Sequence, residues 1–183
     1  MQAGAAAGKS GVMVVFPNGE TRKLAPGPSS IISKAVVEEF AKIFLEMPAV
    51  LWLSESGNKV VQRDDGLAAS IGLQIEADKD LPDLILVDLA PVDPLIVFVE
   101  VVASDGPIAD RRQKALYALT DAAGFKRSQV AFVTAFQDRE SAAFRKTMSA
   151  LAWDSFAWFA SEPTNIVHLK DGNTNRQFLS EFL

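Results

Sequence analysis

Two carboxylates occupy apolar stretches of this chain, where an ionised side chain is costly to bury. Asp83 opens the stretch DLILV, and Glu100 lies inside LIVFVEVV, residues 95–102. Neither stretch carries a basic residue beside its acid. A buried carboxylate has to be hydrogen-bonded, protonated or bound to a cation. The two acids are therefore the first candidates for chemistry.

The spacing of the apolar residues predicts where these acids lie. Side chains alternate between the two faces of a strand, so Glu100 shares a face with Ile96 and Phe98. If the two strands pair antiparallel through the short connection 90–94, Asp83 at the start of one lies near Glu100 at the end of the other. Facing carboxylates repel unless a positive group lies between them, and Mg²⁺ prefers oxygen ligands. The pattern therefore predicts a magnesium site.

A third acid is expected on the first predicted helix. Glu39 flanks the apolar stripe of that helix, whereas Glu38 points away from the stripe and is expected to be solvated. Glu39 is therefore the better placed of the two to reach a buried metal site, with a purely structural acid as the equal alternative. For Asp83 and Glu100, the alternative to a metal site is that Asp83 caps a turn and Glu100 faces solvent.

The elements that position these acids follow from hydrophobic periodicity and turn residues. A hairpin is expected over 12–24 around Asn18-Gly19, followed by a helix that ends near residue 46. Further helices are expected over 107–123 and 139–151, and residues 63–82 are expected to be irregular. Strands are expected over 50–54, 59–61, 84–89, 95–102, 130–136, 156–160 and 166–169. Adjacent strands followed by helical crossovers predict an α/β fold, with a mixed sheet and helices on both faces.

Composition excludes several classes of protein. The chain of 183 residues is long enough for one domain with a sizeable core. It has no cysteine, which excludes disulfides and thiolate zinc sites. A net charge of −5 argues against a protein that binds mainly by attraction to phosphate. No apolar run approaches the ~20 residues of a membrane span, and the first residues lack the apolar core of a signal peptide, so we expect a cytoplasmic protein without a membrane partner.

Longer motifs point to a known family. Pro82-Asp83 followed by Glu100 on the next strand resembles the PD-(D/E)xK nuclease pattern. The surrounding sequence resembles the C-terminal catalytic domain of the BsuBI/PstI restriction endonucleases over roughly residues 49–169. The segments that carry this resemblance are FVEVVASDGPI, then Arg112, FVTAFQDR, and LAWDSFAWFASEP with IVHL. The resemblance implies a restriction endonuclease-like core of order α-β-β-β-α-β. It also implies Mg²⁺-dependent hydrolysis of DNA phosphodiesters, with Asp83 and Glu100 as metal ligands.

The chain departs from the general nuclease pattern at one position. Many nucleases of this fold place a lysine two residues after the second acid, where this chain has Val102. That lysine helps to orient the attacking water and to neutralise charge in the transition state. Another cation is therefore expected to act with Glu100. The candidates are Lys59, just past a turn, and Arg112, which lies on the apolar side of the second long helix.

The resemblance also sets expectations about organisation and partners. Family members are longer and carry an N-terminal domain that this chain is expected to lack, so we divide it into a flexible tail plus hairpin over 1–26 and a catalytic domain over 27–183. The implied partner is double-stranded DNA, with a homodimer and a separate DNA-recognition domain or subunit as further options. Two alternatives to a nuclease remain: a catalytically inactive binding or assembly module with this fold, or the catalytic half of a split restriction system.

Overall fold

The computed structural model describes residues 10–55, 59–76, 80–104, 106–173 and 176–183. In chain order the elements are β1 (Val12–Val15), β2 (Thr21–Leu24), α1 (Pro28–Ala35), η1 (Val36–Phe40), α2 (Ala41–Phe44), β3 (Pro48–Glu55), β4 (Lys59–Arg63), α3 (Asp65–Ser70), β5 (Leu84–Asp88), β6 (Leu95–Val101), α4 (Asp110–Ala122), η2 (Arg127–Gln129), β7 (Val130–Phe136), α5 (Ala142–Thr147), η3 (Met148–Ala150), β8 (Ser155–Phe159), β9 (Ile166–Leu169) and η4 (Leu179–Phe182).

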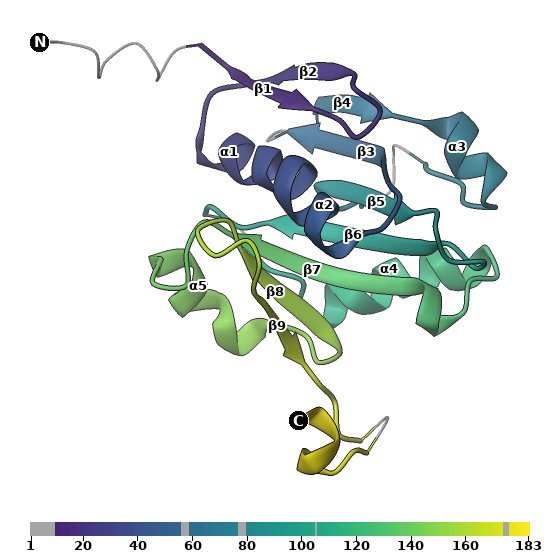
Figure 1. Ribbon diagram of the computed structural model, residues 1–183, viewed down its shortest axis with the longest axis vertical. Helices are drawn as coiled ribbons and strands as arrows, with labels where there is room; N and C mark the ends of the chain where they lie inside the picture. Colours follow the sequence, from purple (N-terminus) through teal and green to yellow (C-terminus); the bar gives the residue numbers. More distant parts are fainter. Residues whose placement is uncertain (1–9, 56–58, 77–79, 105, 174–175) are drawn as a thin grey trace, which may run out of the picture.

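A seven-stranded mixed sheet forms the centre of the molecule. Its strand order is β4-β3-β5-β6-β7-β8-β9 (Figure 1). The pairs β6–β7 and β7–β8 are parallel, and the other neighbouring pairs are antiparallel. Since α4 provides the crossover between the parallel strands β6 and β7, the core runs α1-β3-β5-β6-α4-β7, with β4 as an added edge strand. The core order expected from the sequence is confirmed.

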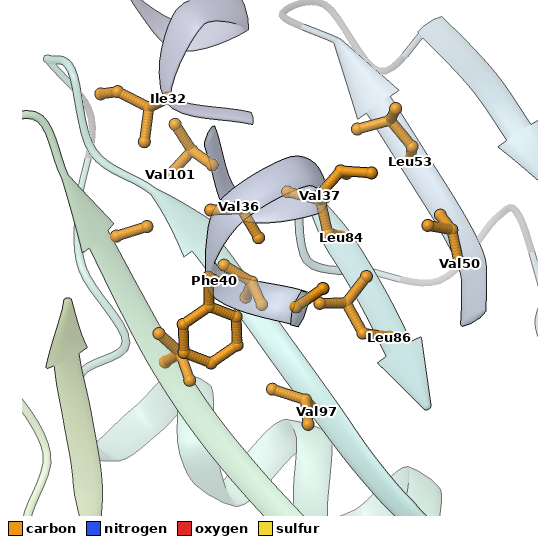
Figure 2. Close-up of a cluster of buried hydrophobic side chains, with 14 of the residues drawn as sticks. Ile32, Val36, Val37, Phe40, Val50, Leu53, Leu84, Leu86, Val97 and Val101 are labelled. Atoms are coloured by element: carbon orange, nitrogen blue, oxygen red, sulfur yellow. The ribbon is translucent and has the colours of Figure 1, made fainter. Parts of the chain in front are cut away.

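Apart from Asp88 and Glu100, the residues of the central strands β5 and β6 are apolar, as expected where helices cover both faces. On one face, the first helix packs on the sheet, with Val36 and Val37 in one cluster with Leu84 (Figure 2). Phe40 extends toward β8, where its ring contacts Trp158. On the other face, α4 lies behind the sheet in Figure 1, and Leu116 packs with strand residues that include Phe98 and Phe132. A strand buried on both sides reads as a continuous apolar run rather than an alternating one.

The first helix differs from a regular α-helix in its middle. Between α1 and α2, the five residues Val36–Phe40 form a π-helical turn, η1. This wider turn buries two consecutive residues, Val36 and Val37, against the sheet. It therefore changes which side chains after residue 36 face the core, relative to the regular helical spacing on which the sequence analysis relied.

The N-terminal hairpin forms as predicted and packs on the same core as the first helix. Gly19 supplies the positive φ of the turn, 87°. Val14, Phe16 and Leu24 are buried in one cluster with Ile32. The hairpin expected within 1–26 thus shares its packing with the region from residue 27 onward. The tail expected over residues 1–9 lies outside the described residues.

Two local expectations were wrong. Residues 63–82 were expected to be irregular, but they include α3, whose first turn is capped by Asp64 accepting from the Leu67 N–H at 2.9 Å. The helix expected over 139–151 is shorter, because α5 begins at Ala142 after its own cap, Ser141, and continues as the 3₁₀ turn η3. Among the described residues no helix is both long and apolar enough to cross a bilayer.

Candidate functional site

Asp83 and Glu100 meet at one end of the central strand pair. The β5–β6 register pairs Leu84 with Val99, so the next residues outward, Asp83 and Glu100, fall opposite each other. Alternation from the buried Ile85 and Phe98 places both acids on the face of the sheet that α4 covers. Their carboxyl groups lie close enough to share a hydrogen bond. The structure thus brings together the two acids that the sequence singled out.

The environment of Glu100 disfavours its ionised form. The Glu100 side chain is only 13% exposed. Burial raises its pKa, and the negative charge of Asp83 raises it further, while Arg112 lowers it only in part; the net result is a pKa of about 8. The pair therefore retains a proton near neutral pH, which is the behaviour of two carboxylates that share a site without a cation between them.

Arg112 connects this pair to α4 and to the segment that precedes β5. Its Nε donates to Glu100 Oε1 at 2.7 Å. Its Nη1 contacts the backbone oxygen of Asp80 at 2.9 Å and the Asp80 carboxylate at 2.7 Å, and its Nη2 donates to the Leu81 carbonyl at 2.7 Å. Most of its five N–H donors are therefore committed to the protein. Its position on the apolar side of α4 is explained by this reach to a buried carboxylate.

Asp83 is fixed by both neighbouring strands. Its Oδ2 accepts a hydrogen bond from the Val101 N–H at 2.8 Å, and its backbone carbonyl accepts from the Ser54 N–H at 2.9 Å. One carboxylate oxygen of Asp83 is thereby hydrogen-bonded to β6, and its main chain is hydrogen-bonded to β3.

Val102, at the position where many related nucleases carry lysine, is part of an apolar cluster. It is 1% exposed and packs with Phe136, Leu151 and Phe159. Its N–H donates to the Ala135 carbonyl at 2.9 Å, which continues the ladder with β7. A lysine ammonium at this position would be surrounded by aromatic and aliphatic carbon. The departure from the pattern is therefore built into the core.

Glu39, expected to be a third metal ligand, is not brought to the pair. The first helix covers the face of the sheet opposite to α4, and Glu39 is exposed on it. Its neighbour Glu38 is the partly buried one, accepting from the Val15 N–H and the Lys34 ammonium, both at 2.8 Å. The expected exposure of these two acids was therefore reversed. The π-helical turn that contains both of them explains the error, because it breaks the regular spacing.

Lys59, one of the two expected cations, also lies apart from the acids. It is exposed on the edge strand β4, directly opposite Glu55. The Glu55 carboxylate accepts from the Ala25 N–H at 2.7 Å, on the side of the sheet where β2 and α1 lie. Side chains paired across two strands share a face, so Lys59 points away from the face that holds Glu100.

The donor set of the pair fits a hard divalent cation. Both side chains supply carboxylate oxygens, and a cation between them would remove the repulsion that raises the pKa of Glu100. Within the described ranges, no group of three or more histidine, aspartate or glutamate side chains has metal-binding geometry. Mg²⁺ is commonly held by one or two carboxylates together with waters and substrate phosphates, so two acids are sufficient.

Sequence reasoning missed Asp80, whose exposed carboxylate is the second partner of Arg112. The only available signal was its place three residues before Asp83 in a polar segment, which does not distinguish it from other surface acids. It also missed Asp88, the buried acid at the other end of β5. An aspartate inside an apolar run, LILVD, was visible in the sequence and could have been noted.

Comparisons with known proteins bear on the family and on the fold. The model of the BsuBI/PstI restriction endonuclease domain matches residues 12–172. The type II restriction enzyme BsuBI of Bacillus subtilis is 25% identical over 157 residues, which cover 86% of this chain and 48% of that enzyme. The structure of the SdaI restriction endonuclease superimposes with a TM-score of 0.77 at 26% identity, covering 93% of this chain and 51% of the other.

The chain thus spans about half the length of the relatives it matches. Its mixed sheet flanked by helices is the restriction endonuclease-like, PD-(D/E)xK type of fold expected from the sequence. With the family domain extending from the N-terminal hairpin to just beyond β9, the chain belongs to the BsuBI/PstI restriction endonuclease family.

Proposed function

We propose that this chain is the nuclease domain of a type II restriction system, and that it hydrolyses phosphodiester bonds of double-stranded DNA with Mg²⁺ held by Asp83 and Glu100. The observation that carries the proposal is the pair itself: two carboxylates in contact at the end of an apolar sheet, with the pKa of Glu100 raised to about 8. A strongly perturbed acid beside a second acid is typical of a functional site. Membership of a restriction endonuclease family supplies the reaction class.

Each side chain has a distinct task in this proposal. A bound Mg²⁺ would supply a Lewis acid for the phosphate and a lower pKa for an attacking water. Asp83, aligned by the Val101 N–H, presents its oxygens in a fixed direction. With a cation bound, Glu100 would be ionised, because the negative charge of Asp83 that disfavours its ionisation would be compensated.

Arg112 acts as a positioning residue. Its Nε bond sets the rotation of the Glu100 carboxylate, and its bonds to Asp80 and Leu81 fix the guanidinium itself. It also provides the positive charge in contact with Glu100. We assign no part to Lys59 or Glu39, since both are exposed and lie away from the pair.

Cleavage of plasmid DNA tests the proposal. The wild type is compared with Asp83→Asn and Glu100→Gln in Mg²⁺, in Mn²⁺ and in EDTA, with folding of each variant checked by circular dichroism. We expect cleavage by the wild type in either metal, none in EDTA, and none above background by either variant. Equal cleavage by folded wild type and variants would remove the assignment.

The partners follow from the same proposal. Since the chain spans about half of its relatives, DNA sequence recognition is assigned either to surfaces of this domain or to a separate domain or subunit. A homodimer would place two sites on the two strands of a duplex. A nuclease acting on cellular DNA would work in the cytoplasm. Sedimentation of the chain with and without duplex DNA measures the oligomeric state.

One observation favours a second candidate function, a nuclease-fold module that binds without turnover. Val102 is buried among aromatic side chains, so the lysine of the general pattern has no counterpart at this position. Under this alternative the pair still binds Mg²⁺, and calorimetry would show metal binding that depends on Asp83. The cleavage assay would show no product at any metal concentration.

A further inference from the structure

The three tryptophans of this chain differ in exposure, and Trp153 is the one that lies at the surface. Trp52 and Trp158 are 4% and 0% exposed, and their indole N–H groups donate to the carbonyls of Pro82 and Pro163. Trp153 is 60% exposed, and its indole N–H donates to none of the described residues. Tryptophan is enriched where proteins contact a partner. The proposed function leaves this side chain without a role.

The main chain around Trp153 is held on both sides. The Ala152 N–H donates to the Ile108 carbonyl at 2.9 Å, and the Gln113 Nε2 donates to the Trp153 carbonyl at 2.9 Å. Asp154 follows with a φ of 58°, in the left-handed region that aspartate adopts more readily than most residues. The indole is therefore presented from a fixed main chain, which reduces the entropy lost when it contacts a partner.

Trp153 is attached to the same end of α4 that reaches the acid pair. Gln113, which holds it, directly follows Arg112, whose Nε donates to Glu100. Consecutive helical residues point about 100° apart, so Trp153 and the acids flank the first turns of α4. A helix with its side chains is about 10–12 Å across, a separation that one bound DNA duplex can span.

The helix that precedes Trp153, α5, covers the same face of the sheet as α4. The Phe144 ring of α5 contacts the rings of Phe136 and Phe159, with centroids 5.1 and 4.9 Å apart. Phe136 shares its face of β7 with Phe132, which packs with α4. The acids, α4, α5 and the segment that leads to Trp153 therefore lie on one side of the sheet.

This segment is positively charged, although the chain as a whole carries −5. Between Glu140 and Asp154 the sequence has two cations, Arg145 and Lys146, and no acid. Both are exposed, and neither forms an ion pair within the part of the chain that the structure describes. Positive charge beside an exposed aromatic ring matches a nucleic acid, whose phosphates are anionic and whose bases present flat faces.

The same charges argue against a second copy of this chain as the partner. In a twofold dimer centred on Trp153, Arg145 and Lys146 of the two copies would lie close together and repel each other.

We propose that Trp153, Arg145 and Lys146 form a contact surface for double-stranded DNA beside the acid pair. The indole packs against the sugars and base edges of one groove, as apolar side chains do in proteins that contact base steps, and the two cations lie against phosphates. The inference rests on the proposed function and names the surface that holds its substrate. The contact keeps the duplex on the α4 side of the sheet, with one phosphodiester bond at Asp83 and Glu100.

Tryptophan fluorescence with acrylamide as the quencher tests the indole directly. In EDTA the free protein should be quenched strongly, because Trp153 is exposed, and a DNA duplex should reduce this quenching. Trp153→Phe assigns the signal: its remaining tryptophans are buried, so quenching should be weak with or without DNA. A wild type that is quenched equally with and without bound duplex would overturn the proposal. Protection that grows with protein concentration alone would identify a second copy as the partner and would also overturn it.

Anisotropy of a labelled duplex in EDTA measures what the indole contributes to affinity. Trp153→Ala should bind about tenfold more weakly, whereas Trp153→Phe, which keeps an aromatic ring, should stay within about threefold of the wild type. The melting temperature should change little, because the side chain is exposed. Phe178→Ala is the matched control, since Phe178 is a 75% exposed aromatic residue beyond β9. Equal affinity of Trp153→Ala and the wild type would overturn the proposal.

The salt dependence of the same binding separates the cations from the indole. Arg145→Gln and Lys146→Gln should each lower the slope of log affinity against log salt concentration by about one, while Trp153→Ala should leave it unchanged. Lys42→Gln is the matched control, because Lys42 is an exposed lysine of α2, on the opposite face of the sheet. An unchanged slope in both cation variants would overturn the assignment of these residues to phosphates.

These measurements are made in EDTA and need no cleavage, so they stand apart from the nuclease assay. A protein that binds DNA in this way and cleaves none in Mg²⁺ would refute only the proposed function. A protein that cleaves DNA while Trp153→Ala binds as the wild type does would refute only the contact surface.

Discussion

Two buried carboxylates lie at opposite ends of the β5–β6 pair and differ in what surrounds them. Asp88, 6% exposed, accepts from the N–H groups of Glu46, Met47 and Ala90 at 2.9, 2.8 and 3.1 Å. Burial alone would raise its pKa, but these three donors lower it below the ordinary value of 3.8. Glu100 has burial and a second carboxylate acting together, with only Arg112 opposing them.

The contrast separates a structural acid from a functional one. Asp88 ties the end of the first helix to β5, since its ionised form is fully satisfied by backbone donors. Glu100 and Asp83 instead face each other, and besides the Arg112 and Val101 donors they share a proton or, as we propose, a cation. Burial is therefore a poor guide to function by itself. The number of donors that point at the carboxylate decides which of the two roles it has.

The largest expected effect is that of Glu100→Gln, which should lower DNA cleavage without lowering the stability of the fold. Removing a metal ligand forfeits several kcal/mol of transition-state stabilisation, so Glu100→Gln should lower DNA cleavage by about 10³-fold or more. The same change removes an unfavourable charge pair, so the free energy of unfolding near pH 8 should not fall. Urea denaturation and plasmid cleavage measure the two quantities. A large loss of stability would contradict this account of Glu100.

Asp88→Asn should show the reverse behaviour. The three N–H groups donate to both carboxylate oxygens of Asp88, whereas an amide has a single acceptor oxygen, so at least one of these part-buried hydrogen bonds should be lost and the free energy of unfolding should fall by about 1–3 kcal/mol. Cleavage per folded molecule should be unchanged, because Asp88 lies at the far end of β5 from Asp83. Active-site titration corrects for the folded fraction. A loss of cleavage by folded protein would show that the two ends of the strand pair are coupled.

Arg112→Met tests the group that partly offsets the repulsion at Glu100. We expect cleavage to fall about 10- to 100-fold, the range for residues that orient metal ligands. The pKa of Glu100 should rise further, which NMR of the labelled carboxyl group would detect. Arg111→Met is the matched control, because Arg111 is the exposed neighbour on the same helix turn. Equal losses for both variants would point to a general charge effect.

The pH dependence of stability should also differ between the two acids. The folded-state pKa of Glu100, about 8, lies above its ordinary value of 4.5, so between these values the folded protein holds a proton that the unfolded chain has lost. Stability should therefore decline as pH rises through this window, by at most ~1.4 kcal/mol per pH unit. The pKa of Asp88 is lowered, so its contribution is present above pH 3.8 and is lost on further acidification.

Metal-free urea denaturation from about pH 5 to about pH 8 measures this slope. The decline should be absent in Glu100→Gln and retained in Asp88→Asn. A slope that is the same in the wild type and in Glu100→Gln would show that another group titrates in this window, and the contrast between the two acids would lose its electrostatic basis.

Much of the fold was predictable because the sheet is apolar and its turns are marked. The strands expected over 130–136 and 166–169 agree with β7 and β9 to the residue. The contact between Asp83 and Glu100 was also predictable, since strand alternation and a short connection determine it. These features depend on local periodicity, which a single sequence carries.

The partners of the acids were harder to predict because they come from distant segments. Asp80, the second partner of Arg112, lies in a polar stretch without periodicity and is separated from Arg112 in sequence by β5 and β6. The three donors to Asp88 belong to the main chain at residues 46, 47 and 90. The π-helical turn over Val36–Phe40 has no distinct sequence signal here, and it reversed the expected exposure of the acids that it contains.

The smallest expected effects concern the first helix, where a third acid was sought. Glu38→Gln should lower the free energy of unfolding by about 1 kcal/mol, since its carboxylate accepts from the Val15 N–H and the Lys34 ammonium, whereas Glu39→Gln should stay within ±0.5 kcal/mol. Neither change should alter Mg²⁺ binding measured by calorimetry. Weaker Mg²⁺ binding by Glu39→Gln alone would mean that the helix turns toward the acids when metal binds. If Mg²⁺ binding is unchanged in both variants, Asp83 and Glu100 are the two carboxylates that hold the ion, and water and phosphate fill its remaining coordination positions.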